Sequence, residues 1–493
     1  MLCVSTRGKS PAVTIPQAVL DGIAPDGGLY IPEYIPSLNL DSLQSLSSYP
    51  EIAETVFKAL LSGYSDEILK LTACRAYGQG LFPVDVTPLV RVGDSYILEL
   101  FHGPTAAFKD MALSVLPSLM ASSRQMLLAH SRFLILTATS GDTGSAAMRG
   151  FAGIEGFQTL VFYPVEGISE VQKAQMQTMP GSNVDAVGIR GNFDDAQSGV
   201  KRIFHSALTQ NILLPGNLKL SSANSINIGR LVPQIVYYFK AYKDLVASGS
   251  ITSGEKIDFS VPTGNFGDIL AGYIAREMGL PVGLLICASN SNRVLTDFLQ
   301  TGAYDFNREL LSSLSPSMDI LVSSNLERLL YMTSDADTGK VSRMMTSAQS
   351  SGKYQADEGI MKKVREVFVG VSCSDEQTLS TISHVFKEQG YLIDPHTAAA
   401  WYAMDEVKKR GIGNRVSVVL STASPFKFPG AMLKALGEEN VDDSLNLPLR
   451  LEDKTGQPAP AAVRSLANMQ VLHNEVIGKD EMESYTLGRA LTW

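Results

Sequence analysis

Cysteine is scarce in this sequence of 493 residues, and its four copies are scattered along the chain. Cys3, Cys74, Cys287 and Cys373 show none of the short spacings that zinc sites use, and the six histidines form no HExxH pair. We therefore expect neither a metal site nor a framework of disulfide bonds.

Long apolar runs are missing as well. The sequence has no stretch of about eighteen apolar residues, the length that a membrane-spanning helix needs. The first residues, MLCVSTRGKSP, lack the basic cluster and apolar core of a secretory signal, and they do not form an Arg-rich amphipathic transit peptide. We expect a cytoplasmic protein without a membrane partner.

The sequence has fewer basic residues than acidic ones. The 41 Lys and Arg residues are outnumbered by 50 Asp and Glu residues, and the formal net charge is −9. Proteins that bind nucleic acids need basic surface to displace counterions from phosphates, so no nucleic-acid partner is expected. We expect a small-molecule substrate, and an anionic one would need a local positive pocket. We expect the protein to be a monomer or a homodimer.

The length of the chain indicates several domains, because it exceeds what one hydrophobic core usually organises. Residues 1–95 contain short mixed segments, which we interpret as an N-terminal cap domain. In residues 96–435 short apolar runs alternate with helical patterns, which predicts parallel sheets wrapped by helices in two subdomains, the smaller at about 130–245. Residues 436–493 form a C-terminal extension, whose acidic, then Pro- and Ala-rich part at 437–465 indicates an exposed connection.

In the segment FHGPTAAFKDMALSVLPSLM, Lys109 stands where a loop becomes a helix. A cation is unfavourable there, because the free backbone N–H groups at a helix start already create a positive potential. The same potential would lower the pKa of the amine and expose the neutral form, which attacks an aldehyde to give a Schiff base. The alternative interpretation is a surface lysine whose charge is offset by Asp110.

Two loops with glycines follow apolar strands and precede helices. In PTGNFGD (262–268), glycines would let backbone N–H groups converge on a phosphate, although the motif is neither GxGxxG nor a P-loop. In TSGDTG (139–144), hydroxyl and N–H groups would hold a carboxylate or a phosphate. The alternatives are a tight strand-to-helix turn for the first loop and ordinary helix capping for the second.

Two further segments place polar groups beside apolar stretches. NSINIGR (224–230) opens a helix, and the guanidinium of Arg230 would match phosphate oxygens in bidentate fashion. In STASP (421–425), a hydroxyl at a strand end would face a ring nitrogen without protonating it. The alternatives are a capped helix with an exposed arginine, and a turn residue that bonds its own backbone.

Taken together, these segments resemble the long-chain threonine synthase family of pyridoxal 5'-phosphate (PLP) enzymes. The resemblance covers nearly the whole chain up to about residue 435, and its motifs are STRG, APDGGLYIP, ELFHGPTAAFKD, TATSGDTGSAA, NSIN, PTGNFGDILAGY, SPSMDI, LIDPHTA and STASPFKF. The resemblance implies an α/β fold, PLP-dependent fold type II (tryptophan synthase β-like), in which two α/β domains with twisted, mostly parallel sheets join an N-terminal cap domain.

The resemblance also implies roles for individual residues. Lys109 would carry the cofactor and act as the catalytic base, Thr422 would meet the pyridine nitrogen, and Asp142 would lie near the ring hydroxyl. The cofactor phosphate would be surrounded by Gly264, Asn265, Phe266, Gly267 and Asp268. The substrate carboxylate and phosphate would be contacted by Ser140, Thr143, Asn224, Ser225, Asn227 and Arg230.

The implied reaction converts O-phospho-L-homoserine and water to L-threonine and phosphate. One departure from the family pattern leaves alternatives open: many members have His before the proline of the last motif, with Ala after it, whereas this chain has Ser424 and Phe426. Loss of an imidazole would alter proton delivery. A close branch of threonine synthase-like proteins ends at 2-oxobutyrate, so a phospho-lyase that also releases ammonia is one alternative. The other is a PLP-binding protein without turnover.

Overall fold

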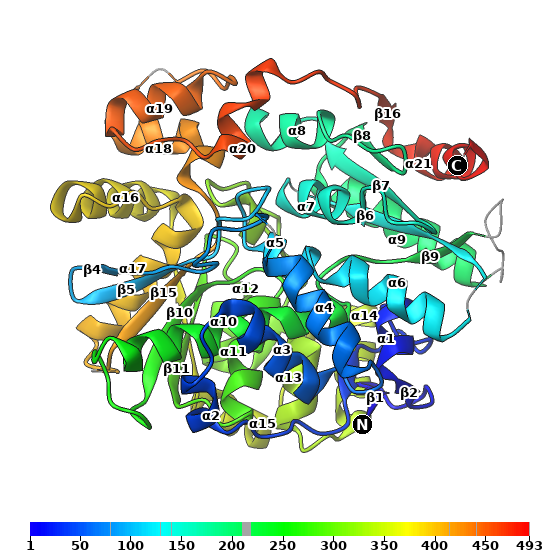
Figure 1. Ribbon diagram of the computed structural model, residues 1–493, viewed down its shortest axis with the longest axis horizontal. Helices are drawn as coiled ribbons and strands as arrows, with labels where there is room; N and C mark the ends of the chain where they lie inside the picture. The colour runs from blue at the N-terminus through cyan, green and yellow to red at the C-terminus, as the bar shows by residue number, and fades with distance from the viewer. Residues whose placement is uncertain are drawn as a thin grey trace.

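Two separate sheets, each covered by helices on both faces, organise the chain (Figure 1). The computed structural model describes residues 1–78, 80–128, 130–139, 141–209, 218–413, 415–439 and 441–492. Nearly all strand pairs in the two sheets are parallel, which confirms the α/β class predicted from alternating apolar runs and helical patterns. None of the helices within these ranges is long and apolar enough to cross a membrane.

The larger sheet has six strands in the order β14-β11-β10-β15-β5-β4, and only the β4–β5 pair is antiparallel. Its strands are β4 (Leu89–Val92), β5 (Ser95–Glu99), β10 (Ile257–Pro262), β11 (Val282–Ser289), β14 (Phe368–Ser372) and β15 (Ser417–Ser421). Because β10 and β15 are parallel neighbours in the sheet interior, their carboxyl ends deliver residues 262–268 and 422–428 to the same edge.

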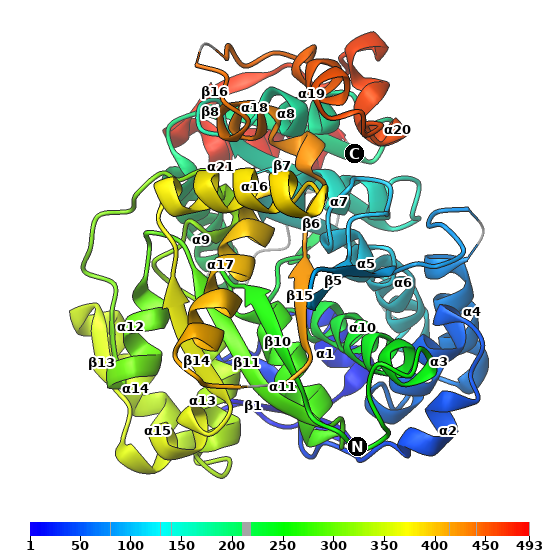
Figure 2. The ribbon, with the colours of Figure 1, turned by 90° about the vertical axis from the view of Figure 1, so that its left-hand side faces the viewer.

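Helices bury both faces of the larger sheet because its strands are apolar on both sides. Leu285 and Cys287 of β11 pack in the same core as α10 (Ile228–Ala247), α11 (Gly267–Glu277) and α12 (Val294–Thr301). Ile286 and Ala288 face the opposite way, toward α16 (Asp375–Gln389) and α17 (Pro395–Lys409), which lie across the sheet in Figure 2. This alternation is what a buried strand of period two requires.

The smaller sheet has five parallel strands in the order β16-β8-β7-β6-β9. They are β6 (Arg132–Ala138), β7 (Phe157–Pro164), β8 (Val184–Arg190), β9 (Leu218–Ser221) and β16 (Val476–Gly478). Val161 and Tyr163 of β7 pack with α7 (Asp142–Phe151) and α8 (Glu170–Gln177). Leu160 and Phe162 pack on the other face with α9 (Phe193–Thr209) and α21 (Met482–Thr492).

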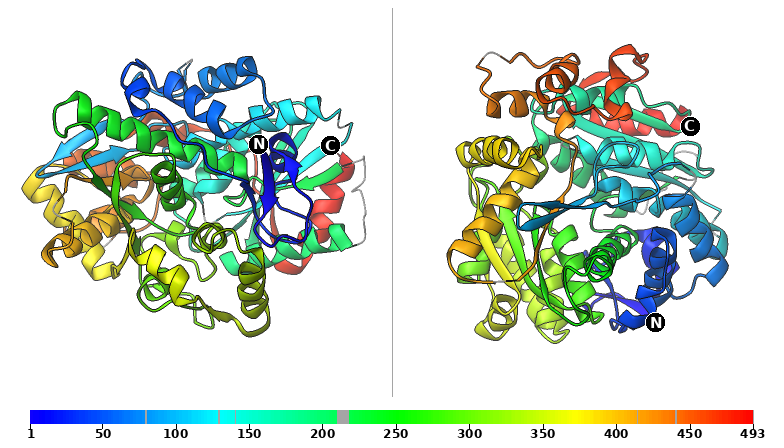
Figure 3. Two further views of the ribbon diagram at one scale, coloured as in Figure 1. Left: turned by 90° about the horizontal axis from the view of Figure 1, so that it is seen from below. Right: turned by 60° about the vertical axis from the view of Figure 1, so that its left-hand side comes forward.

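The N-terminal elements lie against the helices of both sheets (Figure 3). Three antiparallel strands pair in the order β2-β1-β3, and α3 packs on α10 while α1 packs on α6. The elements are β1 (Leu2–Ser5), β2 (Val13–Thr14), α1 (Ile15–Asp21), β3 (Tyr30–Pro32), α2 (Leu40–Gln44), α3 (Tyr49–Leu60) and α4 (Asp66–Tyr77). The hydroxyl of Tyr77 donates to the carbonyl of Met111 at 2.6 Å, which joins α4 to the helix that carries Lys109.

Shorter elements connect these layers. Between the N-terminal segment and β6 lie α5 (Lys109–Leu113) and α6 (Leu116–Met126). Between α12 and α16 lie β12 (Ala303–Asp305), η1 (Pro316–Met318), α13 (Leu326–Thr333), α14 (Thr338–Ser351), β13 (Lys353–Gln355) and α15 (Glu358–Arg365). After β15 come η2 (Pro425–Lys427), α18 (Pro429–Ala435), α19 (Leu447–Thr455), α20 (Ala461–Arg464), η3 (Leu466–Asn468) and η4 (Lys479–Glu481).

The segment at 437–465 differs from the exposed connection that its composition indicates. It forms α19 and α20, and Leu447, Leu451 and Val463 are buried in one core with α18. After it, β16 adds an edge strand to the smaller sheet, and α21 packs on α9. These elements are short, and their few apolar side chains become a core only against neighbours that lie far away in the sequence.

A histidine fastens the last part of the chain to β8. His473 Nδ1 lies 3.1 Å from Asp185 Oδ1, and its Nε2 lies 2.8 Å from the carbonyl of Met179. Tyr485 and Arg489 of α21 contact the other carboxylate oxygen of Asp185 at 3.0 and 2.7 Å. Burial by itself would lower the pKa of His473, but the hydrogen bonds to Asp185 and Met179 outweigh it and raise this pKa above 6.5.

We predict that the C-terminal segment loosens as the pH rises. Since the pKa of His473 is raised in the folded state, its contribution is fully present below about pH 6.5 and is lost as the pH rises through the folded pKa. Hydrogen exchange of β16 and α21, corrected for intrinsic rates, should therefore speed up as the pH rises above about 6.5 and through the folded pKa. The variant His473→Gln should show a flat profile, and an equal rise in that variant would contradict the assignment.

Candidate active site

A cavity of about 820 Å³ lies where the carboxyl ends of β6, β10 and β15 meet. Its volume is within the usual range for a pocket that holds a cofactor and a small substrate. Of the residues singled out in the sequence, the following line it: Lys109, Thr143, Asn224, Ser225, Arg230, Gly264, Asn265, Phe266, Gly267, Asp268 and Thr422. The five separate segments therefore meet at one place, at the strand ends where ligands bind in α/β proteins.

Lys109 begins α5 and reaches the cavity with a side chain that is only 12% exposed. Asp110 does not offset its charge, because the Asp110 carboxylate accepts from the backbone N–H and the hydroxyl of Thr105 at 2.8 and 2.7 Å. Burial raises the pKa of Asp110 to about 6, against these two hydrogen bonds. The structure thus contradicts the interpretation of Lys109 as a surface lysine paired with Asp110.

The pKa of Lys109 is lowered, and the main cause is burial rather than the helix start. Asp142 opposes the shift, whereas Arg230 and Lys427 add to it. The helix α5 has only five residues, and the preceding residue, Phe108, is itself helical, so the potential at its start is small. The expected direction is therefore correct, while the cause is different.

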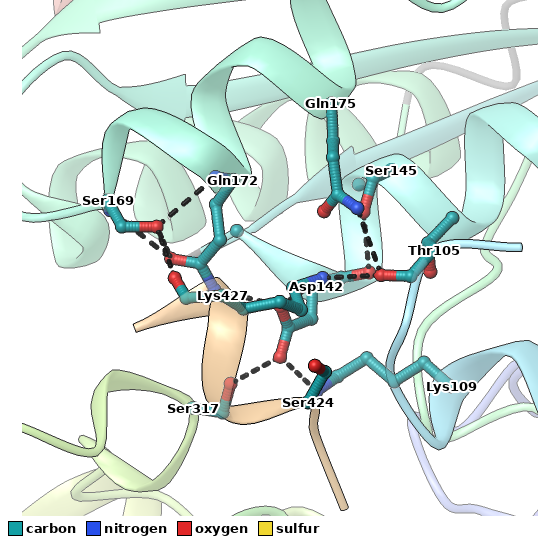
Figure 4. A network of polar contacts seen from close by, with 12 residues as sticks. Thr105, Lys109, Asp142, Ser145, Ser169, Gln172, Gln175, Ser317, Ser424 and Lys427 are labelled. Carbon is teal, nitrogen blue, oxygen red and sulfur yellow. Dashed lines mark hydrogen bonds and ion pairs between the residues drawn. The ribbon is translucent and has the colours of Figure 1, made fainter. Parts of the chain in front are cut away.

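Asp142 is the centre of a buried polar network (Figure 4). It is the first residue of α7, and its Oδ1 lies 2.9 Å from Lys427 Nζ and 2.8 Å from Gln172 Nε2. Its Oδ2 accepts from the Ser317 hydroxyl at 3.1 Å and lies 3.6 Å from Lys109 Nζ. Burial would raise the pKa of Asp142, but the two lysines and Gln172 outweigh it and hold this pKa well below its usual range.

The turn at 264–268 presents free donors to the cavity wall. Serine and asparagine side chains hold its carbonyls: Ser323 donates to Gly264 at 2.8 Å and Asn325 to Asn265 at 3.0 Å. Within the described ranges, no hydrogen bond uses the backbone N–H groups of residues 265–267. Phe266 has a left-handed backbone, with φ of 62°, and α11 starts directly after it. Free N–H groups at a helix start fit a phosphate.

Asp268 ends this turn as a buried carboxyl group. The hydroxyls of Tyr237 and Tyr238 donate to its Oδ1 at 2.6 and 3.1 Å. Burial raises its pKa to about 6, although the two tyrosine hydrogen bonds act in the opposite direction. A carboxyl group that is easily protonated can lie near a phosphate at a smaller electrostatic cost than a carboxylate.

Arg230 is a buried cation without a carboxylate partner in the described part of the chain. Its side chain is 3% exposed, Nη1 donates to the carbonyl of Ala223 at 2.8 Å, and Nε has no hydrogen-bond partner there. Burial lowers its pKa to about 10, so the guanidinium is still charged at neutral pH. The energetic cost of this isolated charge indicates that an anion completes the site.

The segment before Arg230 divides into two roles. Asn224 and Ser225 line the cavity, but Asn227 does not. Asn227 caps α10: its Oδ1 accepts from Gly229 N at 2.9 Å, and its Nδ2 donates to the carbonyls of Val19 and Ser222. The structure therefore gives Asn227 the alternative role of helix capping and places it outside the set of cavity-lining residues. Ser140 lies outside the described residues.

Thr422 and Ser424 follow β15. Thr422 lines the cavity, and its carbonyl accepts from Phe108 N at 2.8 Å, which fixes the end of β15 beside Lys109. Ser424 takes the position at which the family resemblance leads us to expect a histidine, and its hydroxyl accepts from Phe426 N at 3.4 Å. An imidazole does line the cavity, however: His396 at the start of α17, whose Nδ1 lies 2.8 Å from Asp394.

Five residues in or beside the cavity have contacts that the sequence motifs did not lead us to predict. They are Lys427, Gln172 and Ser317, which surround Asp142, and the pair His396 and Asp394. Four of the five lie in motifs that carry the family resemblance, SPFKF, SPSMDI and LIDPHTA, while Gln172 is noticeable only as part of a capping box.

Three family models match consecutive parts of the chain. "Threonine synthase N terminus" matches residues 3–77, "Pyridoxal-phosphate dependent enzyme" matches 83–423, and "Threonine synthase, C-terminal" matches 397–477. Threonine synthase from Pseudomonas aeruginosa is 41% identical over 92% of this chain and 93% of its own. The chain belongs to the threonine synthase family. The resemblance therefore extends beyond residue 435, where the motifs alone placed its end.

Solved structures of threonine synthases share the whole fold. The yeast enzyme aligns with a TM-score of 0.87 at 32% identity, covering 100% of this chain and 99% of that one. The PLP-bound enzyme from Brucella melitensis aligns with a TM-score of 0.85 at 35% identity, with the same coverage. These matches confirm PLP-dependent fold type II and pyridoxal phosphate as the cofactor.

Another group of relatives is longer. The protein named threonine synthase-like 1 from Macaca fascicularis is 38% identical over 90% of this chain, but the match covers only 61% of that protein. The chain thus spans less than two thirds of the length of these threonine synthase-like relatives.

The residues of the cavity fit pyridoxal phosphate. A largely buried lysine with a lowered pKa suits a covalent bond to an aldehyde, and the free N–H groups at 265–267 suit a phosphate. Gly264 also leaves no room for a side chain, because a Cβ atom there would lie 2.7 Å from the carbonyl oxygen of Ser317.

We predict that Gly264→Ala weakens PLP binding. The added methyl group must displace the turn from Ser317, at a cost of about 1–3 kcal/mol, so PLP affinity measured by cofactor titration should fall about tenfold or more. Gly430→Ala is the matched control, since a Cβ there would be 3.9 Å from Leu447 and Val441. A variant Gly264→Ala that binds PLP as tightly as Gly430→Ala would show that the turn is not a phosphate site.

Proposed function

We propose that this chain is a threonine synthase that converts O-phospho-L-homoserine and water to L-threonine and inorganic phosphate. The observation that carries this proposal is Arg230, a buried guanidinium without a carboxylate partner in the described ranges, in the same cavity as Lys109. A phosphorylated amino acid supplies the missing anion. The substrate phosphate would lie at Arg230, with Asn224 and Ser225 beside it.

Lys109 is proposed to have two tasks. Its amine, whose pKa is lowered by burial, holds the cofactor and then serves as the base at the α-carbon of the substrate. When bound, pyridoxal phosphate takes up the electrons that remain after such a proton leaves, which is the chemistry no side chain provides. We propose that Thr422 meets the ring nitrogen, that Asp142 lies near the ring hydroxyl, and that residues 264–268 hold the phosphate.

Release of phosphate requires that a β-proton leaves and that the bond between the γ-carbon and the ester oxygen breaks, and the phosphate leaves with the electron pair of that bond. Arg230 is placed to stabilise this developing charge in a buried cavity, where an electrostatic interaction is stronger than in water. The γ-carbon then takes up a proton, one water molecule gives its OH group to the β-carbon and releases its other proton, and the α-carbon regains a proton, which gives threonine. Thr143 is proposed to help hold the substrate carboxylate at the start of α7.

A second candidate is a phospho-lyase, which turns the same substrate and one water into 2-oxobutyrate, ammonia and phosphate. Two observations favour it. Ser424 gives no imidazole after β15, and the chain is similar to proteins named threonine synthase-like 1. The two reactions share every step up to phosphate release, so phosphate alone does not distinguish them. A PLP-binding protein without turnover would release no phosphate.

The test is to incubate the purified holoenzyme with O-phospho-L-homoserine and to measure phosphate, threonine and 2-oxobutyrate together. We expect threonine in equal amount to phosphate. Equal 2-oxobutyrate would establish the phospho-lyase, and no phosphate would reject both reactions. Lys109→Ala should abolish the absorbance of the bound cofactor and all turnover, and normal turnover in that variant would refute the assigned base.

We predict that Arg230→Met reduces turnover without reducing stability. Loss of the guanidinium should lower kcat for phosphate release about 10²–10³-fold. Because Met also removes a buried unpaired charge, the melting temperature of the apoprotein should stay equal or rise.

The control for this variant is Arg328→Met. Arg328 is fully buried too, but it donates to the carbonyls of Tyr30 and Ile226 at 2.6–2.9 Å and also contacts Asn325. Its loss should lower the melting temperature by several degrees. If Arg230→Met were destabilised as much as Arg328→Met, Arg230 would be a structural residue.

We also propose that the protein resides in the cytoplasm and acts as a monomer or a homodimer. The apolar side chains of the described helices lie mainly in shared cores, which supports a protein that works in water. Light scattering of the purified chain measures its assembly state directly.

A further inference from the structure

The side chain of Lys427 is the least exposed charge in the network around Asp142. It is 0% exposed, and its ammonium donates to the carbonyl of Thr105 at 2.8 Å and contacts Asp142 at 2.9 Å. Its own carbonyl accepts from the Ser169 hydroxyl at 2.9 Å. A buried ammonium is costly, and it persists only where its partners are well placed. Neither the motifs nor the family models assign a task to this charge.

Two buried lysines share one carboxylate. Asp142 lies 2.9 Å from Lys427 but 3.6 Å from Lys109, beyond ordinary hydrogen-bond distance. Gln172 donates at 2.8 Å to the same oxygen that Lys427 contacts, Oδ1, and Ser317 donates at 3.1 Å to Oδ2, the oxygen that faces Lys109. Figure 4 shows Lys427 and Lys109 approaching Asp142 from different segments. Lys427 is therefore the nearer of the two cations to the Asp142 carboxylate.

We propose that Lys427 is a positioning residue: its buried ammonium holds the Asp142 carboxylate in place and so denies Lys109 a full counter-ion, which favours the neutral, reactive amine of Lys109. This inference rests on the proposed role of Lys109 in holding the cofactor. In this proposal, Lys427 influences the protonation of Lys109 although Lys427 itself does not line the cavity.

The geometry explains why one lysine acts on another. The charged groups that face Lys109 are Asp142 on α7, Arg230 on α10, Asp268 on α11 and Lys427 on η2. Removal of Lys427 takes away a nearby cation and frees Asp142 to approach Lys109. Both changes stabilise the ammonium form, so the pKa of Lys109 must rise. At a fixed pH below that pKa, each unit of increase leaves about tenfold less neutral amine.

Lys427 also joins the two sheets. It follows β15 of the larger sheet, whereas Asp142 and Gln172 begin helices on the smaller sheet, and Thr105 lies in the loop before Lys109. A shift of the smaller domain would move Asp142 relative to both lysines.

The experiment measures how fast the apoprotein captures PLP at pH values from about 6 to 10, followed by the absorbance of the bound cofactor. Borohydride trapping and peptide mass spectrometry verify that Lys109 is the residue modified. In the parent protein, the rate should be half-maximal at a pH below the ordinary lysine pKa of about 10.4. Lys427→Met should move this midpoint upward by about 1–3 units, and Lys427→Arg, which restores the charge, should return it.

Two further variants separate charge from structure. Lys434→Met removes an exposed lysine of α18 and should leave the midpoint unchanged. Lys427→Gln retains an amide donor for Thr105, so it should fold where Lys427→Met does not, and it should show the same upward shift. An unshifted midpoint in the folded Lys427→Gln or Lys427→Met protein, or an equal shift in Lys434→Met, overturns the proposal.

The outcome also separates this inference from the proposed function. If the parent apoprotein captures no PLP on Lys109, the proposed function fails. If the parent captures PLP but the Lys427 variants keep its midpoint, only the role of Lys427 fails. Circular dichroism of each variant verifies that a change in midpoint arises in a folded protein.

Discussion

One carboxylate shared by two buried lysines is the constraint on which the site depends. Asp142 can neutralise only one positive charge, and it lies closer to Lys427 than to Lys109. Burial lowers the pKa of Lys109, and Asp142, its carboxylate partner at 3.6 Å, offsets this shift only in part. The chain places that amine on the cavity wall and the better-paired ammonium away from solvent.

The fold supplies this constraint by joining segments that lie far apart in the sequence. Strands β10 and β15 end at the same edge of the larger sheet, and α7 and α8 approach from the smaller one. Two backbone hydrogen bonds fix the loop that precedes α5 to the segment that follows β15. Phe108 N donates to the carbonyl of Thr422, and Ser424 N donates to the carbonyl of Ala106. Rigid backbone at these junctions keeps the ends of long lysine side chains in place.

The cavity-lining residues that could be predicted from the sequence lie in continuous motifs at strand ends. Residues 264–268 are of this kind, because they lie directly between β10 and α11, and Lys109 begins α5 after the loop that follows β5. Asn227 shows the limit of such patterns: a polar residue at a helix start suits both a ligand and a cap, and only the positions of Val19 and Ser222 decide for the cap. The roles of Lys427 and Ser317 could not be predicted from the sequence, because they depend on contact with Asp142, which lies more than a hundred residues away.

The C-terminal elements and Lys109 both show that burial depends on the whole fold and not on the local sequence. The acidic, then Pro- and Ala-rich composition of 437–465 indicates an exposed connection, but Leu447, Leu451 and Val463 are buried in a core that also includes residues of α8, α17 and α18. For Lys109, a local argument from the helix start gave the right direction for its pKa, while burial, a property of the whole fold, is the larger cause. The local sequence pattern thus predicted the direction of the pKa shift correctly but not its main cause.

The buried cations explain why stability and function oppose each other in this cavity. Arg230 has no carboxylate partner in the described ranges, and Lys109 has a distant one, so the ligand-free protein bears the cost of charges that only ligands can neutralise. An anion that binds the folded state alone returns this cost as binding free energy. The same free energy is available for catalysis only if the phosphate is held more strongly as it departs than when it arrives. A guanidinium in a buried site meets that condition, because the charge on the phosphate increases as its bond to carbon breaks.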